Sequence, residues 1–278
     1  MRIISWNVNG VRATTGKLKN GEKKGGPTNN VIKTLVEEQK PDVLCFQEVK
    51  TQSEGDLACF KPLFKHIYCN FSKHKKGYSG VALLTNVEPV WVTYGFDEYP
   101  EEYIGDYANK EFHHEGRIIS AGFADYIVVT VYSPNAQPEL ARIETRIEWE
   151  QVLRMYLKQI EEDHGLPVIL CGDLNCAIHD MDIYNPKMKK KTPGCSVEER
   201  DEFQLMFDAG FTDSFRHLHP DIQKYSYWSN FHNARERNMG WRIDYMLVSD
   251  AIKDAITEAD CLTDYYGSDH CPVLLALQ

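Results

Sequence analysis

Short apolar runs rich in β-branched and aromatic residues recur along almost the whole chain, and this pattern limits most strongly the folds that the chain can adopt. They read RIISWNV, DVLCFQE, SGVALLT, PVWVTYG, RIISAGF, YIVVTVY, PVILCGD, RIDYMLVS and PVLLALQ. Runs of this length and composition are typical of β-strands. Because many of them follow one another directly, we expect packed mixed sheets with helices outside, and not a strictly alternating barrel.

Three stretches with helical spacing interrupt the strands. The first covers about residues 30–39, the second begins near Pro138 and stops at Gly165, and the third covers about residues 197–209. Proline favours the first turn of a helix and glycine favours its end, which supports these limits. No linker rich in proline, glycine or serine is long enough to separate two domains, so we expect one domain over residues 1–278.

Composition places the chain among ordinary folded proteins, with 42% hydrophobic and 26% charged residues. The longest apolar runs are far shorter than the ~20 residues of a membrane-spanning helix. The N-terminal MRIISWNVNG is already strand-like and has no secretory signal pattern. The eight cysteines include no C-x-x-C pair, and we expect free thiols. We therefore expect an intracellular protein of the nucleus or cytoplasm that is neither secreted nor bound to a membrane.

The net charge of −10 argues against a polyanionic partner, but the charges are distributed unevenly along the chain. Residues 97–115 alone supply six of the ten excess negative charges. Lysines cluster elsewhere, at Lys17–Lys24, Lys73–Lys76 and Lys187–Lys191. Each cluster taken singly is typical of a solvated loop, yet together they leave room for phosphate contacts.

Polar side chains that can bind metal or move protons stand repeatedly at the ends of the apolar runs. They are Asn7, Asn9, Glu48, Tyr132, Asn135, Asp173, Asn175, Asp244, Asp269 and His270. One such residue is usually a turn or cap residue, but six separate segments with the same feature are poorly explained in that way. If the strands are neighbours in the sheets, these residues converge on one cleft.

The residue types in this set indicate the chemistry. Carboxylates and amides, without cysteine or paired histidines, suit a hard cation such as Mg²⁺. The chain has neither a P-loop lysine motif nor a G-x-S-x-G nucleophile motif. The simplest matching reaction is attack of water on a phosphodiester, with one side chain activating the water.

Seven ordered blocks carry a resemblance to a known family. They read SWNVNGVRA, PDVLCFQEVK, GYSGVALL, YSPNA, CGDLN, NARERNMGWRIDY and GSDHCP. In this order they resemble the exonuclease III family of apurinic/apyrimidinic (AP) endonucleases, and the long block around NMGWRIDY is closer to the human-type branch. The resemblance implies a DNase I-like, four-layered α/β sandwich of two packed mixed sheets flanked by helices, forming a single catalytic domain.

The resemblance also implies the activity. The chain would use Mg²⁺, with Mn²⁺ as a substitute, to cleave double-stranded DNA on the 5′ side of an abasic site. The products would be a 3′-hydroxyl and a 5′-deoxyribose phosphate, as in base excision repair. Exonuclease activity in the 3′–5′ direction and 3′-phosphodiesterase activity would accompany it, and the enzyme would act as a monomer.

Roles for the strand-end residues follow from the same resemblance. Glu48 would bind the metal, with Asn9 and Asp269 nearby and with Asp173, Asn175 and His270 on the metal side as well. Asp173 would orient or deprotonate the attacking water, which Asn175 would position. His270, held by Asp244, would contact the scissile phosphate together with Asn7 and Asn135. Tyr132 would stabilise the phosphate or the leaving oxygen.

Recognition of the lesion is implied for a separate group of residues. Tyr227, Trp228 and Trp241, with Phe231 near them, would wall a small pocket that admits a flipped abasic sugar. Further DNA contacts would come from Arg12, Tyr78, Asn185, Lys187 and Arg235. Asn9 stands where human-type members carry aspartate, and Pro138 stands where they carry an arginine that reaches the DNA, so metal affinity and grip on the duplex are expected to differ.

Two other functions remain open at this point. A broader metal-dependent nuclease or phosphodiesterase of the same superfamily would keep the strand-end acids and the Asp269–His270 pair, but it would not need Trp241. A non-catalytic protein that binds damaged DNA would not need the acids at all. Because Glu48, Asp173, Asp244 and His270 are all present, the second alternative is the more remote.

Overall fold

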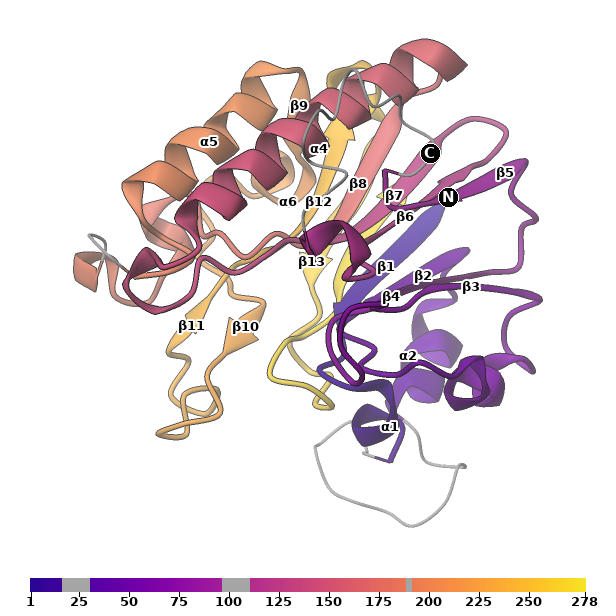
Figure 1. The fold of residues 1–278 in the computed structure, drawn as a ribbon, viewed down its shortest axis with the longest axis horizontal. Helices are drawn as coiled ribbons and strands as arrows, with labels where there is room; N and C mark the ends of the chain where they lie inside the picture. The colour runs from indigo at the N-terminus through magenta and orange to yellow at the C-terminus, as the bar shows by residue number, and fades with distance from the viewer. Residues whose placement is uncertain (17–30, 97–110, 189–191) are drawn as a thin grey trace.

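Two six-stranded mixed sheets pack face to face, with helices on their outer faces (Figure 1). The computed structural model describes residues 1–16, 31–96, 111–188 and 192–278. The Lys17–Lys24 cluster, residues 97–110 of the acidic segment and Lys189–Lys191 lie outside these ranges. The predicted sandwich of two mixed sheets flanked by helices is confirmed.

The first sheet contains the N-terminal and the C-terminal strands of the chain. In spatial order it consists of β13 (Ile256–Cys261), β14 (Val273–Leu277), β1 (Arg2–Asn7), β2 (Val43–Gln47), β4 (Val81–Thr85) and β3 (His66–Asn70). β1 pairs parallel with β2, and its other neighbour, β14, is antiparallel. The second half of β1 and the start of β14 therefore lie at the same edge of the sheet.

The second sheet repeats this arrangement. In spatial order it consists of β5 (Trp91–Tyr94), β6 (Ile118–Gly122), β7 (Ile127–Tyr132), β8 (Val168–Asp173), β12 (Asp244–Ser249) and β9 (Phe211–Asp213). β7 and β8 are parallel, with Tyr132 opposite Asp173. β12 is antiparallel to β8, with Asp244 also opposite Asp173. Three polar residues are thus aligned side by side at the end of this sheet.

Alternation along the strands explains why the apolar runs are nearly continuous. In β2, Val43 and Cys45 point into the core between the sheets, whereas Leu44 and Phe46 point into the core under the helices. In β8, Ile169 and Leu170 divide in the same way between the inner and the outer core. Both faces of the central strands are therefore buried, and each strand needs apolar side chains on both faces.

Helices cover the two outer faces (Figure 1). The α-helices are α1 (Val11–Thr14), α2 (Val31–Gln39), α4 (Ile143–His164), α5 (Val197–Asp208) and α6 (Ser214–Leu218). The 3₁₀ helices are η2 (Glu54–Phe60), η4 (Glu111–His114), η5 (Pro138–Leu140), η6 (Asp180–Asp182), η7 (Pro186–Met188) and η8 (Asp250–Ala255). Apolar residues of α2 pack on the first sheet, and those of α4 and α5 pack on the second. Within the described ranges, no helix combines the length and apolar character needed to cross a membrane.

The predicted helices and strands agree with the structure except at specific places. The long helix does not begin at Pro138, which opens the separate turn η5, but at Ile143. The two-residue strands at 227–228 and 240–241 are not among the predicted runs, and neither are the edge strands β3, β9 and β13. The edge strands pair on one side only, and the exposed faces of β3 and β13 carry polar residues such as His66 and Glu258, which interrupt the apolar pattern.

Gly172 is the one position in β8 where a side chain cannot be accommodated. Its φ is +142°, and a Cβ atom there would lie 1.9 Å from the carbonyl oxygen of Val131 in the neighbouring strand. Backbone cannot yield as a flexible side chain does. The glycine therefore permits β7 and β8 to pair closely next to Asp173.

We predict that Gly172→Ala lowers the free energy of unfolding by on the order of 3 kcal/mol, because the methyl group would force the two strands apart. Urea unfolding followed by circular dichroism measures this change. Gly165→Ala is the matched control, since Gly165 also has a positive φ, +60°, but has no atom within 4 Å of the added Cβ. It should cost only about 1 kcal/mol; equal losses in the two variants would contradict the proposed clash.

Candidate active site

The strand ends of both sheets meet around one cavity of about 480 Å³. Its lining includes most of the polar residues singled out in the sequence: Asn9, Glu48, Tyr132, Asn135, Asp173, Asn175, Asp269 and His270. Asn7 and Asp244 lie directly behind this wall, fully or almost fully buried. The predicted convergence of the polar strand ends on one site is thus present in the structure.

The side chain of Asn7 connects the two sheets at this cavity. Its Nδ2 donates to Glu48 Oε1 at 2.9 Å and to Asp173 Oδ2 at 2.8 Å. Its Oδ1 accepts a hydrogen bond from the backbone N–H of Asn9 at 3.0 Å. Asn7 is 0% exposed and its amide is already paired with these groups, and the phosphate contact expected of it stays a prediction.

His270 lies between two carboxylates. Its Nδ1 is 2.8 Å from Asp244 Oδ2, and its Nε2 is 3.8 Å from Asp173 Oδ2. Burial by itself would lower the pKa of His270, but attraction to Asp244, the hydrogen bond to it and attraction to Asp173 raise the pKa to about 10. The imidazole is therefore a cation at neutral pH, with Nδ1–H donating to Asp244.

Asp173 is a buried carboxylate, 1% exposed, that lies beside the carboxylate of Asp244. Burial and repulsion from Asp244 raise the pKa of Asp173 to about 7, although His270 acts to lower it. The backbone N–H of Asn175 donates to Asp173 Oδ1 at 2.9 Å. A carboxylate with a pKa near neutrality can accept a proton from water without being permanently protonated.

Two side-chain oxygen atoms, one from Glu48 and one from Asn9, contact the ammonium of Lys50. Lys50 Nζ lies 2.6 Å from Glu48 Oε2 and 2.5 Å from Asn9 Oδ1. Burial would raise the pKa of Glu48, but Lys50 and the hydrogen bond from Asn7 outweigh it and lower the pKa. Asn9, Glu48 and Lys50 all have left-handed backbone conformations, with φ between 45° and 51°. Such conformations are costly for residues with side chains and concentrate at functional sites.

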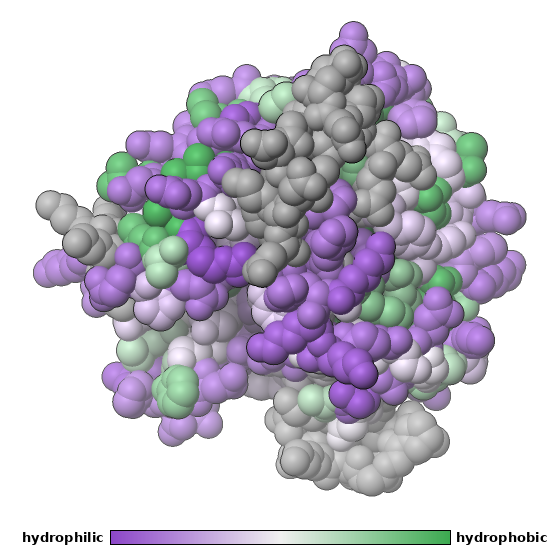
Figure 2. All heavy atoms as spheres, in the orientation of Figure 1, coloured by the Kyte–Doolittle hydropathy of each residue, from purple (hydrophilic) through white to green (hydrophobic). Residues whose placement is uncertain are grey.

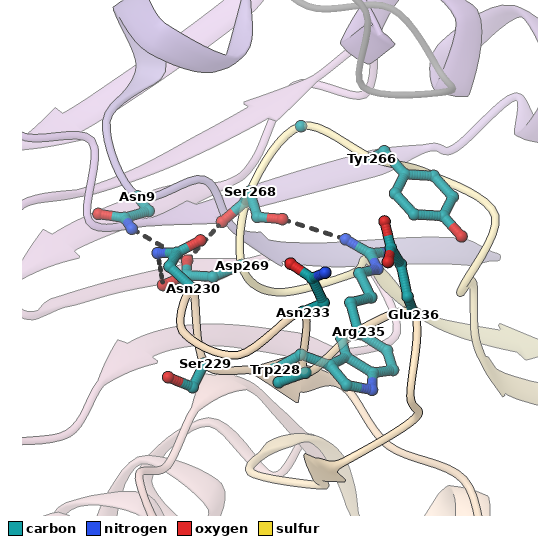
Figure 3. A pocket seen from close by; sticks show the side chains of 12 residues that line it. Asn9, Trp228, Ser229, Asn230, Asn233, Arg235, Glu236, Tyr266, Ser268 and Asp269 are labelled. Atoms are coloured by element: carbon teal, nitrogen blue, oxygen red, sulfur yellow. Dashed lines mark hydrogen bonds between the residues drawn. The ribbon is translucent and has the colours of Figure 1, made fainter.

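Asp269 adjoins this group and separates the cavity from a neighbouring pocket of about 340 Å³ (Figure 3). Asn9 Nδ2 donates to Asp269 Oδ1 at 3.0 Å, and Asn230 Nδ2 donates to Asp269 Oδ2 at 3.2 Å. The hydroxyl of Ser268 also donates to Oδ1. These neutral donors hold the carboxylate in place without cancelling its charge, as Figure 3 shows.

The residues expected to hold a metal therefore form two groups. The first contains Asp173, His270 and Asn175, whose backbone N–H donates to Asp173. With Asp244, for which no metal contact was expected, Asp173 and His270 have ligand atoms within 4.8 Å of one another, a spacing that could hold a metal ion. Both groups already contain a cationic side chain, His270 in the first and Lys50 in the second. The two groups differ in their ligand atoms, because the first includes an imidazole nitrogen whereas Glu48, Asn9 and Asp269 offer only oxygen atoms. The second group therefore fits a hard cation better.

Tyr132 is positioned by a buried arginine. The guanidinium of Arg117 lies 4.6 Å from the centre of the Tyr132 ring, and it donates to the Tyr132 carbonyl at 2.8 Å and to the Tyr78 hydroxyl at 3.0 Å. Burial and the nearby negative charge of Glu48 raise the pKa of Tyr132 well above its ordinary value, despite Arg117. The phenol therefore keeps its proton and can donate it in a hydrogen bond.

Two amides complete the polar wall. Asn135 Nδ2 donates to Asn175 Oδ1 at 3.2 Å, and Asn175 Nδ2 donates to the carbonyl of Ser133 at 2.8 Å. Asn175 has a left-handed conformation with φ of 49°. The amide pair is thus fixed in orientation beside Asp173.

Another part of the cavity wall is apolar and partly aromatic. Tyr227 and Trp241 face each other across the two-stranded sheet of β10 (Tyr227–Trp228) and β11 (Gly240–Trp241), and Ile243 lies beside them. The Tyr227 ring is 4.8 Å from the ring of His270. This wall and the polar groups at the strand ends therefore share one cavity.

Two of the expected wall residues lie elsewhere. Trp228 is 3% exposed, its indole N–H donates to Asn238, and it lines the neighbouring pocket (Figure 3). Phe231 is 74% exposed and lines neither cavity. A strand reverses its side-chain direction at each residue, so Tyr227 and Trp228 cannot both face the same cavity.

The other residues expected to bind DNA are distributed over the surface. The side chain of Arg12 on α1 is 69% exposed, and Lys187 in η7 is exposed as well. Tyr78 and Asn185 are partly exposed. Arg235 is different, because its guanidinium donates to the carbonyls of Ser268, Thr263 and Tyr265. Its main contacts thus stabilise a loop next to Asp269, and a direct DNA contact stays a prediction. Figure 2 shows hydrophilic side chains over much of one face.

Sequence analysis missed several residues of this site. Lys50 follows Glu48 by two positions, but both residues have left-handed backbone conformations, so the alternation of an extended strand does not predict that its ammonium returns to Glu48. Ile243 directly precedes Asp244 but has no chemical signal of its own. Arg117 and Ser226, whose hydroxyl donates to Asp244 Oδ2 at 2.7 Å, reach the site only through the pairing of distant strands.

Comparisons with known proteins agree with this geometry. Residues 4–270 match the model of the endonuclease/exonuclease/phosphatase family. An exodeoxyribonuclease of Bacillus subtilis is 41% identical over 279 residues, covering 100% of this chain and 99% of the relative. The DNA repair nuclease APEX1 of Danio rerio is 40% identical, covering 100% of this chain and 82% of the relative. The crystal structure of the AP endonuclease LMAP from Leishmania major superposes with a TM-score of 0.82 at 27% identity, covering 100% and 87% of the two chains.

The charge on His270 should depend on Asp244. We predict that Asp244→Asn lowers the pKa of His270 from about 10 to near or below the ordinary value of 6.5, because burial then opposes the charge with less compensation. Nitrogen-15 NMR of the histidine ring between pH 5 and pH 10 measures this change. Asp254→Asn, an exposed acid outside the site, is the control for loss of one charge.

The same substitution should change how stability depends on pH. A raised pKa in the folded state means that the imidazolium stabilises the protein fully below about pH 6.5, and that this contribution is lost as the pH rises towards 10. Asp244→Asn should remove most of this contribution. A His270 pKa that stays near 10 in the variant would show that Asp244 does not hold the charge.

Proposed function

Because this chain belongs to the exonuclease III family of AP endonucleases, within the endonuclease/exonuclease/phosphatase superfamily, we propose that it is a metal-dependent AP endonuclease of DNA base excision repair. It hydrolyses the phosphodiester 5′ to an abasic site in double-stranded DNA and leaves a 3′-hydroxyl and a 5′-deoxyribose phosphate. The similarity to an exodeoxyribonuclease supports accompanying 3′–5′ exonuclease and 3′-phosphodiesterase activities. Residues 1–278 act as one catalytic domain, as a monomer.

One observation carries this proposal. The wall of Tyr227, Trp241 and Ile243 lines the same cavity as Asp173 and His270. A general phosphodiesterase needs the charged groups but has no use for an apolar wall beside them. A site for a sugar that has lost its base needs both, because the wall fills the space that an intact nucleotide would require.

Hydrolysis begins with water held between Asp173 and Asn175. Asp173 accepts the proton as the water oxygen attacks phosphorus, and its pKa of about 7 suits a base that works near neutral pH. His270 faces the scissile phosphate as a cation and stabilises its growing negative charge, while Asp244 holds the ring. Asn135, fixed through Asn175, donates to a second phosphate oxygen.

Groups on the other side of the cavity stabilise the leaving oxygen. Tyr132 is a neutral phenol held by Arg117, and it donates a hydrogen bond to the phosphate or to the leaving oxygen. Glu48, Asn9 and Asp269 would hold the metal, for which we propose Mg²⁺, with Mn²⁺ as a substitute. When bound, the metal neutralises charge on the phosphate and the leaving oxygen. Asn7 keeps Glu48 and Asp173 at a constant separation.

Residues around the cavity bind the DNA duplex. Arg12, Lys187, Tyr78 and Asn185 are available for contacts to phosphates, which position the DNA without reading its sequence. Phe231 and Arg235 belong to the loop beside the neighbouring pocket, where Phe231 is exposed for a DNA contact.

The decisive experiment is single-turnover cleavage of a labelled duplex with one tetrahydrofuran abasic analogue, beside its undamaged twin, with Mg²⁺ and with EDTA. We expect incision only at the analogue and only with metal. Equal digestion of both duplexes would identify a general nuclease. Cleavage of neither would direct attention to phospholipid and inositol phosphate substrates, or to a binding protein if the damaged duplex is still retained.

In the same assay Asp173→Asn should reduce the rate by about 10² to 10⁴ while leaving abasic-DNA binding largely intact.

Trp241 should determine selectivity more than rate. We predict that Trp241→Ala reduces the preference for abasic over intact duplex by about tenfold to a hundredfold, because the enlarged cavity admits an intact nucleotide. Cleavage rates on the two substrates, measured side by side, give this ratio. Trp241→Phe keeps the wall and should retain most of the preference. If Trp241→Ala slows both reactions equally, the wall has only a structural role.

A further inference from the structure

Lys50 occupies the point on which two of the proposed metal ligands converge. Asn9 follows β1 and Glu48 follows β2, so the two side chains come from different strands. Both direct an oxygen atom to Lys50 Nζ, at 2.5 Å and 2.6 Å. The other end of the Asn9 amide donates to Asp269, which fixes the direction in which the Asn9 oxygen points (Figure 3).

We propose that Lys50 is an internal substitute for the metal ion: its ammonium neutralises the ligand group in the metal-free protein and must leave before a divalent cation can bind. This inference rests on the proposed metal-dependent function. It assigns to Lys50 the role of lowering metal affinity while keeping the ligand oxygens aimed at the metal position.

Distances show that the two cations exclude each other. Magnesium binds oxygen ligands at about 2.0–2.1 Å, so an ion bound to both Glu48 Oε2 and Asn9 Oδ1 would lie where the ammonium now lies. The close approach of two positive charges in a partly buried site is strongly unfavourable. The Lys50 side chain is 34% exposed, and its flexible stem can carry the ammonium into solvent when the metal arrives.

The backbone holds the ligands independently of the Lys50 side chain. Gly10 N–H donates to the carbonyl of Glu48 at 2.7 Å, and Lys50 N–H donates to the carbonyl of Ser79 at 3.0 Å. Asn7 Nδ2 also holds Glu48 directly. Removal of the ammonium should therefore leave Glu48 and Asn9 near their present positions, and a Lys50 variant should fold.

Metal binding to the whole, DNA-free protein tests this inference. Mn²⁺ is the probe, because its electron paramagnetic resonance signal reports the free ion directly, and calorimetry with Mg²⁺ provides a second measurement. We expect Lys50→Met to lower the Kd for Mn²⁺ by about two- to fivefold. This range corresponds to loss of an ion pair of the strength usual for partly exposed sites. The thermal shift on adding Mg²⁺ should be larger in Lys50→Met than in the unmodified protein.

Two further variants distinguish competition between Lys50 and the metal from a general effect of protein charge on metal affinity. Lys65→Met removes one positive charge at an exposed position outside the cavity, and it should leave the Kd unchanged. Lys50→Arg keeps a cation at the site, and its Kd should stay close to that of the unmodified protein. A Kd that falls equally in Lys65→Met would reduce the effect to overall charge and overturn the inference.

The outcomes also distinguish this inference from the proposed function. If the unmodified protein binds Mn²⁺ and Lys50→Met binds it equally or more weakly, Lys50 does not compete with the metal, and the inference fails while the metal site stands. If neither protein binds Mn²⁺, and neither cleaves the abasic duplex with it, the metal site itself is wrong. Tighter binding in Lys50→Met alone supports the competition.

Discussion

The hydrogen bonds of the Asn7 side chain are the contact on which the rest of the site depends. One Nδ2 atom joins Glu48, which follows a strand of the first sheet, to Asp173, which ends a strand of the second. The two sheets pack mainly through apolar contacts, which have little directional preference. A buried, fully paired amide supplies the missing direction, because either carboxylate would lose its partner if the sheets slid past each other.

The negative charge of the carboxylates around the cavity is offset in part by two internal cations. His270 lies between the carboxylates of Asp244 and Asp173, and Lys50 forms an ion pair with Glu48. Buried carboxylates would otherwise repel one another and become protonated. The two cations differ in mobility, since His270 is 4% exposed and held by Asp244, whereas the Lys50 side chain is 34% exposed on a flexible stem. One is suited to remain during catalysis, and the other is suited to be exchanged for a metal.

Prediction from the sequence succeeded where a residue's environment depends on its own strand. β1, β2, β7, β8, β12 and β14 are strongly apolar because both of their faces are buried, and their polar ends are conspicuous for the same reason. It failed where the environment depends on distant segments. Arg117 contacts Tyr132 only because β6 pairs with β7. The error at Trp228 has a local cause instead: Trp228 is adjacent to Tyr227 on a short strand, so its side chain points to the other side.

The sequence by itself determined the strand-rich composition, the residues at the strand ends and, through its ordered blocks, the family. Only the tertiary structure decided how those residues are arranged. Asn7 bridges Glu48 and Asp173, Lys50 contacts Glu48 and Asn9, and Phe231 lies apart from the wall that Tyr227 and Trp241 form. The physical reason is that residue type determines which bonds a side chain can make. Which bonds are made depends on the register and packing of strands far apart in the chain.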